Sequence, residues 1–347
     1  MKRIFVGISG GVDSSVAAFL LKEQGYDVQG IFVKTWAPDW VPCTWVDEKR
    51  DAMRICAALD IPFHFLDANE EYKQGVADYM ISEYKLGRTP NPDVLCNKVI
   101  KFGAMWKYAK EHGATGIATG HYAQVKDGKL YKGMDAAKDQ AYFLWMIEKD
   151  LLPQIQFPIG HLQKKEVRAI AEKAGLFTAT KKDSQGICFL GEVDMKDFLR
   201  HYIDEQPGVV LNEEGKIVGE HDGVWFYTLG ERHGFRITEK DTNRTPYYII
   251  AKDVEANTIT VARTVHSQKN TSGKVTVNLR DTNWFIDPEQ GTAYTAQIRY
   301  HGTLLKAEVL NDKTILLEGD EAIPLGQSLL VYKDDIVIGG GVIDFLS

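Results

Sequence analysis

The chain has little cysteine and no long apolar run, and these shortages weigh against several classes of protein. Cysteine accounts for 4 of the 347 residues. That number is too small for a disulfide-stapled secreted domain, so a reducing cytoplasm is the expected location. Met1-Lys2-Arg3 leads directly into a short apolar run. We therefore expect no signal peptide, no transit peptide, no membrane-spanning helix and no membrane partner.

An excess of positive charge is also missing. The formal net charge is −7, which disfavours a nucleic-acid partner because affinity for phosphate backbones comes mostly from lysine and arginine. The stretch 161–200 still carries a mild excess of basic residues, including the pairs Lys164-Lys165 and Lys181-Lys182. Such pairs usually lie on the solvated surface. Net charge therefore neither establishes nor excludes an RNA ligand.

Three familiar catalytic signatures are absent. No CxxC pair or closely spaced histidine pair provides zinc-type spacing, so we predict no metal-ligating residue set of that kind. No GxSxG elbow supports serine-hydrolase chemistry. No lysine closes the first glycine-rich loop, which rules out the kinase-type GxxxxGK[ST] motif.

The glycine-rich segment 9–15 (Ser-Gly-Gly-Val-Asp-Ser-Ser) is the most informative part of the chain. It follows the apolar run 4–8 and precedes an amphipathic run, which predicts a strand, a turn and a helix. Gly10-Gly11 lets the backbone approach a phosphate, and the helix N-terminus favours negative charge. The alternative is an ordinary glycine turn capped by an Asp or Ser side chain. The strand–turn–helix setting favours nucleotide binding, and the segment resembles the loop of ATP pyrophosphatases that adenylate a substrate.

The first two hundred residues alternate strand and helix patterns, which is typical of a doubly wound parallel sheet. Ligands of such sheets lie at the carboxyl ends of the strands, where both 9–15 and 119–122 are expected. The expected strands are 27–33, 63–66 and 115–119, and the expected helices are 49–59, 72–84, 102–112, 164–175 and 192–203.

The pattern changes after 206–208, where short β-rich runs are separated by turn residues. The expected strands are 275–279, 293–300, 304–310, 314–317 and 328–332, and the expected turns include 213–216, 255–257 and Gly339-Gly340-Gly341. We predict an α/β class chain with an ATP-pyrophosphatase (adenine nucleotide α-hydrolase-like) domain at 1–203. A small central β-rich module at 204–266 and a C-terminal β-barrel at 267–347 follow.

Segment 89–97 is dense in turn formers and reactive groups. Its two prolines fix the backbone, and Asp93 precedes Cys96 by three positions. The spacing suits a carboxylate placed beside a thiol. It equally suits a turn followed by a helix-capping Asp93 and a small buried Cys96, and spacing alone does not separate these interpretations.

A second cysteine, Cys188, favours the catalytic interpretation of segment 89–97. Cys188 ends a polar, glycine-bearing segment that begins with Lys181-Lys182, and thiolates form where positive charge lies nearby. Two cysteines in two loops of one ATP-binding domain suggest a nucleophile and a resolving partner. Cys56 lies on an apolar helical face and is most simply a core residue, whereas Cys43 stays ambiguous.

Several motifs together resemble those of the tRNA-specific 2-thiouridylases, and the likeness covers essentially the whole chain. They are residues 9–15, 87–93 with 96–97, 118–122, 138–140 with 142–144, and 186–189, and the likeness continues through 227–230, 327 and 339–341. The opening loop alone is shared with several adenylating enzymes. The combination of Asn91-Pro92-Asp93 with Cys188 is far more restrictive.

The resemblance implies ATP- and persulfide-dependent 2-thiolation of the wobble uridine of tRNA, with Mg²⁺ on the ATP phosphates. By position, Cys96 resolves the intermediate, Cys188 carries a persulfide, and Asp93 is the candidate general base. The implied phosphate-binding residues are Gly7, Ile8, Ser9, Gly10, Gly11, Val12, Asp13 and Ser14, and the implied adenosine contacts are Val33 and Gly120.

The same resemblance implies two partners, the anticodon loop of a tRNA and a persulfide-donating sulfur-carrier protein. Asn91, Pro92 and Asp93 would face the target uridine. The implied tRNA contacts are His121, Lys138, Asp139, Gln140, Arg299, Tyr300 and Gln327.

The chain departs from the family pattern at two places. Relatives usually read Gly-Gln-Arg-Lys-Gly where this chain has Gly230-Glu231-Arg232-His233-Gly234, and Gln-Ser where it has Gln140-Ala141. Three alternatives stay open. One is a different ATP-pyrophosphatase ligase, and another is an RNA-binding module with a decayed nucleotide site. In the third, the same product is made through an iron–sulfur cluster on Asp93, Cys96 and Cys188.

Overall fold

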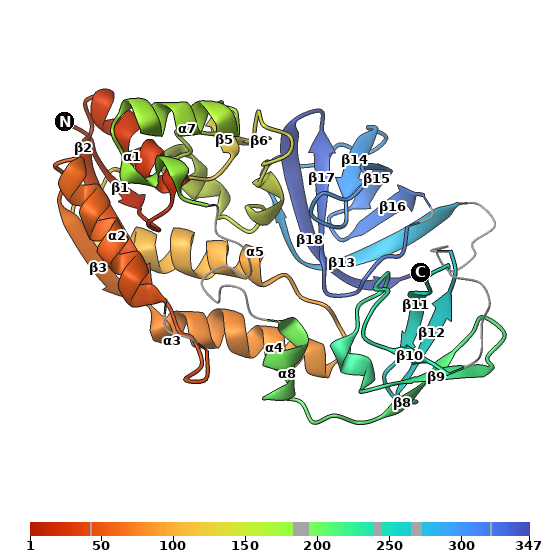
Figure 1. Ribbon diagram of the computed structural model, residues 1–347. Coiled ribbons are helices and arrows are strands. Elements are labelled where there is room, and N and C mark those ends of the chain that lie inside the picture. The colour runs from red at the N-terminus through yellow and green to blue at the C-terminus, as the bar shows by residue number, and fades with distance from the viewer. Residues whose placement is uncertain (42–43, 183–193, 239–244, 265–272, 320) are drawn as a thin grey trace.

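The computed structural model spans residues 1–347 and describes all of them except 42–43, 183–193, 239–244, 265–272 and 320. Cys43 and Cys188 lie outside the described residues. An α/β domain forms one side of the molecule, and two β-rich units lie against it (Figure 1). Among the described residues, no helix is long and apolar enough to cross a membrane.

The N-terminal domain is built on a five-stranded parallel sheet with the order β3-β2-β1-β4-β7. The chain winds outward from β1 in both directions, so the predicted doubly wound parallel sheet is confirmed. The strands are β1 (Arg3–Gly7), β2 (Asp27–Lys34), β3 (Phe63–Asp67), β4 (Gly116–Ala118) and β7 (Ile155–Gln156).

Helices cover both faces of this sheet because successive residues of its central strand point to opposite sides. Ile4 and Val6 of β1 pack in the cluster that contains α1 (Val12–Glu23), α2 (Trp45–Ala58) and α7 (Lys164–Lys173). Phe5 packs in a second cluster on the other face. The helical elements there are α3 (Asn69–Tyr72), η1 (Lys73–Asp78), α4 (Tyr79–Lys85), α5 (Pro92–Cys96), η2 (Asn97–Ala104) and α6 (Met105–Glu111).

A hairpin that the sequence did not reveal joins the α/β domain to the barrel. It consists of β5 (Ala123–Lys126) and β6 (Lys129–Lys132), and Tyr131 of β6 pairs with Ile336 of the last strand. The hairpin therefore extends a sheet made mostly of C-terminal strands. The remaining elements before the central module are η3 (Ala141–Phe143), η4 (Lys149–Gln154), η5 (Phe177–Thr180) and α8 (Met195–Arg200).

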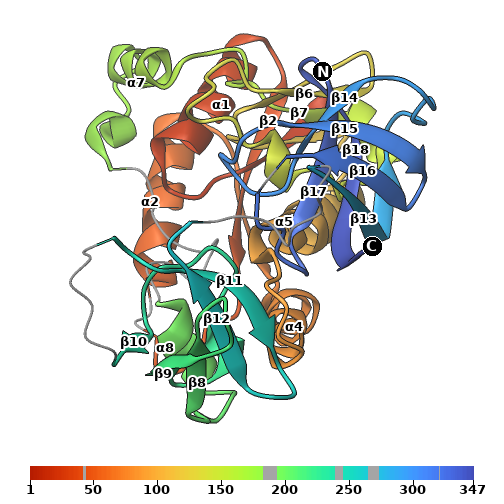
Figure 2. The same cartoon turned by 90° about the vertical axis from the view of Figure 1, so that its right-hand side faces the viewer.

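The central module is a five-stranded sheet with the order β10-β9-β8-β12-β11. Figure 2 shows it below the α/β domain and beside the barrel. Its strands are β8 (Gly208–Leu211), β9 (Ile217–His221), β10 (Arg236–Ile237), β11 (Tyr248–Asp253) and β12 (Thr258–Ala262), and η6 (Val224–Phe226) lies between β9 and β10.

The C-terminal strands form a barrel that closes where β13 pairs with β18. Its core contains Val277, Ile315, Leu329 and Ile343, all fully buried. The predicted barrel is thus confirmed. Its strands are β13 (Lys274–Trp284), β14 (Tyr294–Gln297), β15 (Leu305–Asn311), β16 (Thr314–Glu318), β17 (Ser328–Lys333) and β18 (Ile336–Leu346).

The prediction of a turn at Gly339-Gly340-Gly341 is wrong, because these glycines lie in the middle of β18. An added Cβ would lie 2.4 Å from the Asn283 carbonyl oxygen at Gly339 and 2.5 Å from the Leu329 carbonyl oxygen at Gly340. Side chains at these positions would collide with the strands on either side. Glycine occurs here because the neighbouring strands approach closely, and not because the chain turns.

Cys56 is a core residue, as expected. It is 1% exposed on α2, and burial raises the pKa of its thiol to about 11. An added Cβ at Gly30 of β2 would lie 2.4 Å from the Cys56 sulfur, which shows how closely helix and strand meet here. A thiol in this environment stays protonated and unreactive.

We predict that Cys56→Ser lowers the free energy of unfolding by about 1–3 kcal/mol, because a buried hydroxyl replaces a weakly polar thiol. Urea denaturation measures the loss, and Cys56→Ala is the control that adds no hydroxyl. Activity measured below the unfolding transition should stay at the wild-type value. A large loss of activity in the folded variant would give Cys56 a chemical role that this account denies it.

Candidate functional site

The glycine-rich loop joins β1 to α1 and is held in shape by its own hydroxyl groups. The Ser14 hydroxyl accepts a hydrogen bond from the Ser9 amide at 3.2 Å and donates one to the Gly11 carbonyl oxygen at 3.2 Å. Gly10 has φ +79°, a left-handed conformation that glycine adopts without strain. The first amides of α1 have no intrahelical acceptor, so the loop presents N–H donors to an anion.

The predicted adenosine contacts lie at the same edge of the sheet. Gly120 follows β4, and a Cβ there would lie 2.7 Å from both the Asp13 carbonyl carbon and the Ser14 nitrogen. This distance allows only glycine where the chain passes the loop. Val33 is buried one residue before the end of β2, the strand beside β1. These positions fit a nucleotide site, and their contacts with adenosine stay predictions.

Two lysines reach the loop from distant parts of the chain. The Lys164 ammonium donates to both carboxylate oxygens of Asp13 at 2.8 Å, and the Tyr122 hydroxyl also donates to Asp13 at 2.8 Å. Lys181 donates to the Gly10 carbonyl oxygen at 3.0 Å and to Asp51 at 2.7 Å. The sequence pattern had placed Lys164 on the solvated surface. The structure instead brings two cations to the edge of a phosphate-sized loop.

His121 lies in the interior. It is 7% exposed, its Nδ1 lies 2.7 Å from the Thr119 hydroxyl, and its Nε2 lies 3.3 Å from the Lys101 ammonium. Burial lowers the pKa of His121 well below its usual value, and the Lys101 charge acts in the same direction. The imidazole is therefore neutral and accepts from Lys101. Its contact with tRNA stays a prediction.

The Asn91-Pro92-Asp93 segment begins a helix. Asn91 caps α5 by accepting from the Val94 amide at 3.3 Å, and Pro92 occupies the first helical position. The sequence also allowed a turn followed by a helix that Asp93 caps, with a small buried Cys96. Cys96 is indeed fully buried, but the cap is Asn91 and not Asp93. Asp93 and Cys96 stand three apart on this helix, which places them on one face. The π-helical segment η2 follows Cys96 directly.

Several of the predicted tRNA contacts converge beside α5. The Asn97 side chain donates to the Phe143 carbonyl oxygen at 2.9 Å, and the Phe143 ring lies 4.4 Å from that of Tyr300 in the barrel. Burial raises the pKa of the Tyr300 phenol, and the carboxylates of Asp139 and Asp93 add to the rise. The Tyr300 phenol therefore stays protonated at neutral pH.

The other predicted contacts are engaged with protein atoms. The Asp139 carboxylate accepts from the Gly133 amide at 2.8 Å, and the Gln140 amide oxygen accepts from the Tyr122 amide at 3.1 Å. Arg299 donates to the Leu229 carbonyl oxygen at 2.9 Å. Tyr300 is 36% exposed and Lys138 is partly exposed. Tyr300 is thus the most accessible aromatic among these predicted contacts, and Cys188 lies outside the described residues.

The departure at Gly230–Gly234 has a local explanation. The Glu231 carboxylate accepts from the Thr228 amide at 3.0 Å and pairs with the Lys196 ammonium at 3.2 Å. Lys196 also lies 3.8 Å above the Tyr227 ring. Glu231 therefore acts as a counter-charge within the protein, joining α8 to the central module.

Lys252 is a second cation near Glu231. It donates to the Tyr227 carbonyl oxygen, and burial lowers its pKa from 10.5 to about 8, while the Glu231 charge opposes the shift. At neutral pH the folded state therefore holds a buried ammonium at a cost. Between pH 8 and 10.5 the unfolded chain binds more protons at this site than the folded chain, so stability rises with pH there.

We predict that the free energy of unfolding of the wild type rises by about 2 kcal/mol from pH 7 to pH 9.5 through this group. Lys252→Met should remove that rise. Urea denaturation at several pH values measures the difference between the two proteins. The window ends below pH 10 because burial raises the pKa of Tyr227 to about 12, which lowers stability once unfolded tyrosines ionise. Equal pH dependence in both proteins would contradict a buried ammonium at Lys252.

Comparison with known proteins agrees with this architecture. Three family models match: a tRNA methyl transferase HUP domain over residues 2–192, a tRNA methyl transferase PRC-barrel domain over 196–263, and an aminomethyltransferase β-barrel domain over 256–343. The tRNA-specific 2-thiouridylase MnmA of Geobacillus thermodenitrificans is 45% identical over 99% of this chain and 94% of its own length. The MnmA of Colwellia psychrerythraea is 43% identical over 99% of this chain and 96% of its own length.

A HUP-type α/β domain with a glycine-rich loop, followed by two β-rich units, defines a class of tRNA-modifying enzymes. Within that class, the chain belongs to the tRNA-specific 2-thiouridylase family. The resemblance stated from the sequence motifs is thereby confirmed, and so is the fold class.

Proposed function

We propose that this chain is an ATP-dependent tRNA-uridine 2-sulfurtransferase that acts on the wobble position. One observation carries the proposal most strongly. The glycine-rich loop lies at the carboxyl edge of the sheet, and Asn97, directly after the helix bearing Asp93 and Cys96, bonds Phe143, whose ring contacts that of Tyr300 in the barrel. A nucleotide, a thiol and an RNA-facing aromatic are what such a transfer requires. Residues 1–203 would form the catalytic domain, 204–266 a tRNA-binding module and 267–347 the barrel.

The loop fits the triphosphate of ATP. The amides of residues 10–14 would hold the phosphates. Gly120, which approaches the backbone of Asp13 and Ser14 closely, would lie on the side where adenosine binds. Lys164 and Lys181 already lie on the loop, where their ammonium groups would offset phosphate charge. Asp13 would be the carboxylate nearest a Mg²⁺ ion on the phosphates, because hard cations prefer oxygen ligands.

The chemistry solves a leaving-group problem. The C2 oxygen of uridine leaves poorly, so it is first bonded to the α-phosphorus of ATP, and pyrophosphate departs. The terminal sulfur of a Cys188 persulfide then forms a bond to C2, and AMP departs with the oxygen. The Cys96 thiolate attacks Cys188 and breaks the S–S bond, which leaves 2-thiouridine and a Cys96–Cys188 disulfide. A reductant restores both thiols.

Asp93 is proposed as the base that prepares the Cys96 thiol. Both lie on one face of α5, and Cys96 is fully buried, which excludes bulk water from its sulfur. A carboxylate on the same face is positioned to take the thiol proton once the substrate is bound.

Two partners follow from the proposed chemistry. A tRNA anticodon loop presents its wobble base unpaired, so moving it into the site costs less than extracting a base from a duplex. A sulfur-carrier protein would supply the persulfide to Cys188. The small number of cysteines fits a reducing cytoplasm, where such thiol chemistry is sustained.

The iron–sulfur alternative yields the same product. Asp93, Cys96 and Cys188 would ligate a cluster with one open iron. The described residues contain no set of three or more His, Cys, Asp or Glu side chains arranged to hold a metal, but Cys188 is not among them. We propose the persulfide route and use the cluster route as an outcome of the test.

We predict that Cys96→Ser and Cys188→Ser fail at different steps. Cys188→Ser should accept no persulfide, whereas Cys96→Ser should accept one, form AMP with unmodified tRNA and stop before releasing 2-thiouridine. Mass spectrometry of the protein and nucleoside analysis of the tRNA measure these steps, with protein purified without air. Cys56→Ser is the matched control, because it removes a buried thiol outside the site.

Two outcomes would contradict the mechanism. Wild-type yields of 2-thiouridine from either variant would remove the two-cysteine mechanism. Equal failure of both variants, together with loss of an iron-dependent absorbance that the wild type shows, would establish the cluster route. Absence of tRNA-dependent AMP release from the wild type would overturn the proposed function itself.

A further inference from the structure

Residues 87–90, which lead to the Asn91 cap, contact both the central module and the barrel. Gly87 is met by Val254 of the central module, whose methyl carbon would lie 2.2 Å from an added Cβ. The Thr89 amide donates to the Leu325 carbonyl oxygen of the barrel at 2.8 Å. The Pro90 carbonyl oxygen accepts from the Gln327 side chain at 3.3 Å. The backbone that leads into α5 is therefore set by contacts from outside the α/β domain.

Ion pairs around the buried Glu83 carboxylate fix Arg88, the remaining residue of this segment. The Glu83 side chain is 5% exposed, and its carboxylate lies 3.0 Å from Arg88 and 2.6 Å from Arg280 of the barrel. Arg280 also donates to the Tyr79 hydroxyl at 3.1 Å. Asp344 of β18 lies 3.8 Å from Arg88 and 3.5 Å from Arg280. Glu83 thus joins the catalytic domain to β13 through Arg280. Arg88, three positions before Asn91, also lies beside Asp344 of β18.

A second anchor comes from the central module. The Thr89 hydroxyl lies 3.1 Å from the Thr228 hydroxyl, and the Thr228 amide donates to Glu231 at 3.0 Å. Arg299 of the barrel donates to the neighbouring Leu229 carbonyl oxygen. Glu231 and Arg299 therefore hold the turn that presents Thr228 to Thr89.

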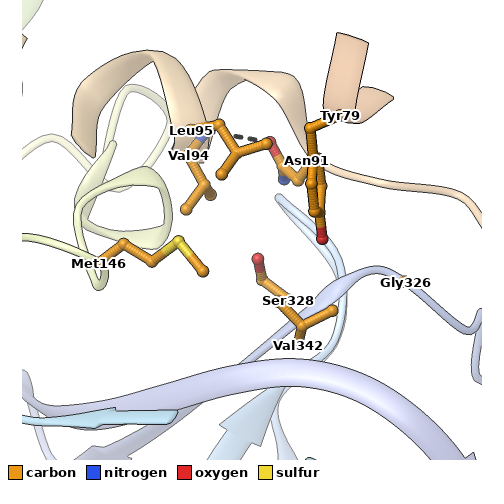
Figure 3. A pocket seen from close by; sticks show the side chains of 8 residues that line it. All are labelled: Tyr79, Asn91, Val94, Leu95, Met146, Gly326, Ser328 and Val342. Atoms are coloured by element: carbon orange, nitrogen blue, oxygen red, sulfur yellow. Dashed lines mark hydrogen bonds between the residues drawn. The ribbon is translucent and has the colours of Figure 1, made fainter. Parts of the chain in front are cut away.

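The barrel also supports Asn91 from below. A cavity of about 10 Å³ separates Asn91 and Tyr79 from Ser328 and Val342 of the barrel, and Met146 closes its side (Figure 3). That volume is at the lower limit for a single water molecule. The start of α5 therefore rests on the barrel almost without a gap.

We propose that the barrel and the central module position the catalytic helix α5, with Arg280 and Thr89 as the positioning residues. The inference rests on the proposed role of Asp93 and Cys96. Neither Arg280 nor Thr89 touches substrate in this account. They act through residues 87–91, whose displacement would move the uridine-facing end of α5. The two β-rich units then contribute to turnover, beyond any contribution to RNA affinity.

Arg280→Met tests the proposal in the full-length protein through the kinetics of 2-thiouridine formation. We expect kcat to fall roughly 10- to 100-fold, because displacements near 1 Å in a catalytic group cost this much. The KM for tRNA should stay within about twofold of the wild-type value, since uniform binding is unaffected. Arg280→Lys should recover part of kcat. Arg236→Met is the control, because it removes an equal charge from a pair with Glu220 that is mostly exposed.

Thr89→Val and Thr89→Ser form a second pair that leaves the buried charges untouched. Valine has the shape of threonine without the hydroxyl, so Thr89→Val removes only the hydrogen bond to Thr228. We expect kcat to fall several-fold, which corresponds to a rise of about 1 kcal/mol in the activation free energy. Serine keeps the hydroxyl and should keep more activity than valine. A raised KM with unchanged kcat in Arg280→Met or Thr89→Val would assign these residues to RNA binding and overturn the proposal.

Hydrogen exchange separates this proposal from the proposed function, because it needs no substrate. Amides in residues 93–97 should exchange at least tenfold faster in Arg280→Met than in the wild type or Arg236→Met. Faster exchange with no thiolation by the wild type would support the positioning contact while rejecting the function. Unchanged exchange in these residues would overturn the positioning role whatever the activity.

Discussion

The geometry of a parallel sheet is the constraint on which the site depends. Strands that run in one direction deliver the segments that follow them to a single edge. Here that edge receives the glycine-rich loop after β1, the end of β2 and the Thr119-Gly120-His121 segment after β4. The close contact between Gly120 and Asp13 is the result. Residues more than a hundred positions apart therefore meet without any local signal that pairs them.

The catalytic helix α5 is connected to this edge differently. It does not follow a strand of the sheet, and contacts from the barrel and the central module define its starting point. Glu83 illustrates the cost and benefit of such a connection. A carboxylate that is almost fully buried is unfavourable alone, but two arginines and the surrounding hydrogen bonds compensate its charge. Removal of one partner is expected to be costly for that reason.

The sequence predicted the parts of the fold that have a local period. The strands and helices around the sheet, and most strands of the barrel, follow from apolar periodicity and turn residues. The β5–β6 hairpin was missed because its few residues carry little pattern and its partner strand is two hundred residues away. The Gly339–Gly341 strand was misread because glycine serves both turns and close strand contacts, and only the facing strands distinguish the two.

The candidate site was predictable to the extent that its motifs are contiguous. The strand–turn–helix around the glycine-rich loop follows from contiguous residues, and so does the start of a helix at Pro92, whereas the functional roles of these residues stay predictions. Lys164 and Lys181 were not assigned to the loop, because their partners Asp13 and Gly10 lie far away in the sequence. Glu231 departs from the family pattern, and its partners Thr228 and Lys196 explain it as a counter-charge within the protein. Such pairings depend on tertiary structure and leave no trace in spacing.

The central chemical claim is that the oxygen removed from uridine leaves as part of AMP. A tRNA carrying ¹⁸O at C2 of the wobble uridine tests it in a single turnover with ATP and a sulfur donor. Mass spectrometry of the released AMP should show one ¹⁸O atom for each 2-thiouridine formed. Unlabelled AMP at full product yield would show that ATP is split by water, and would contradict adenylation of the substrate.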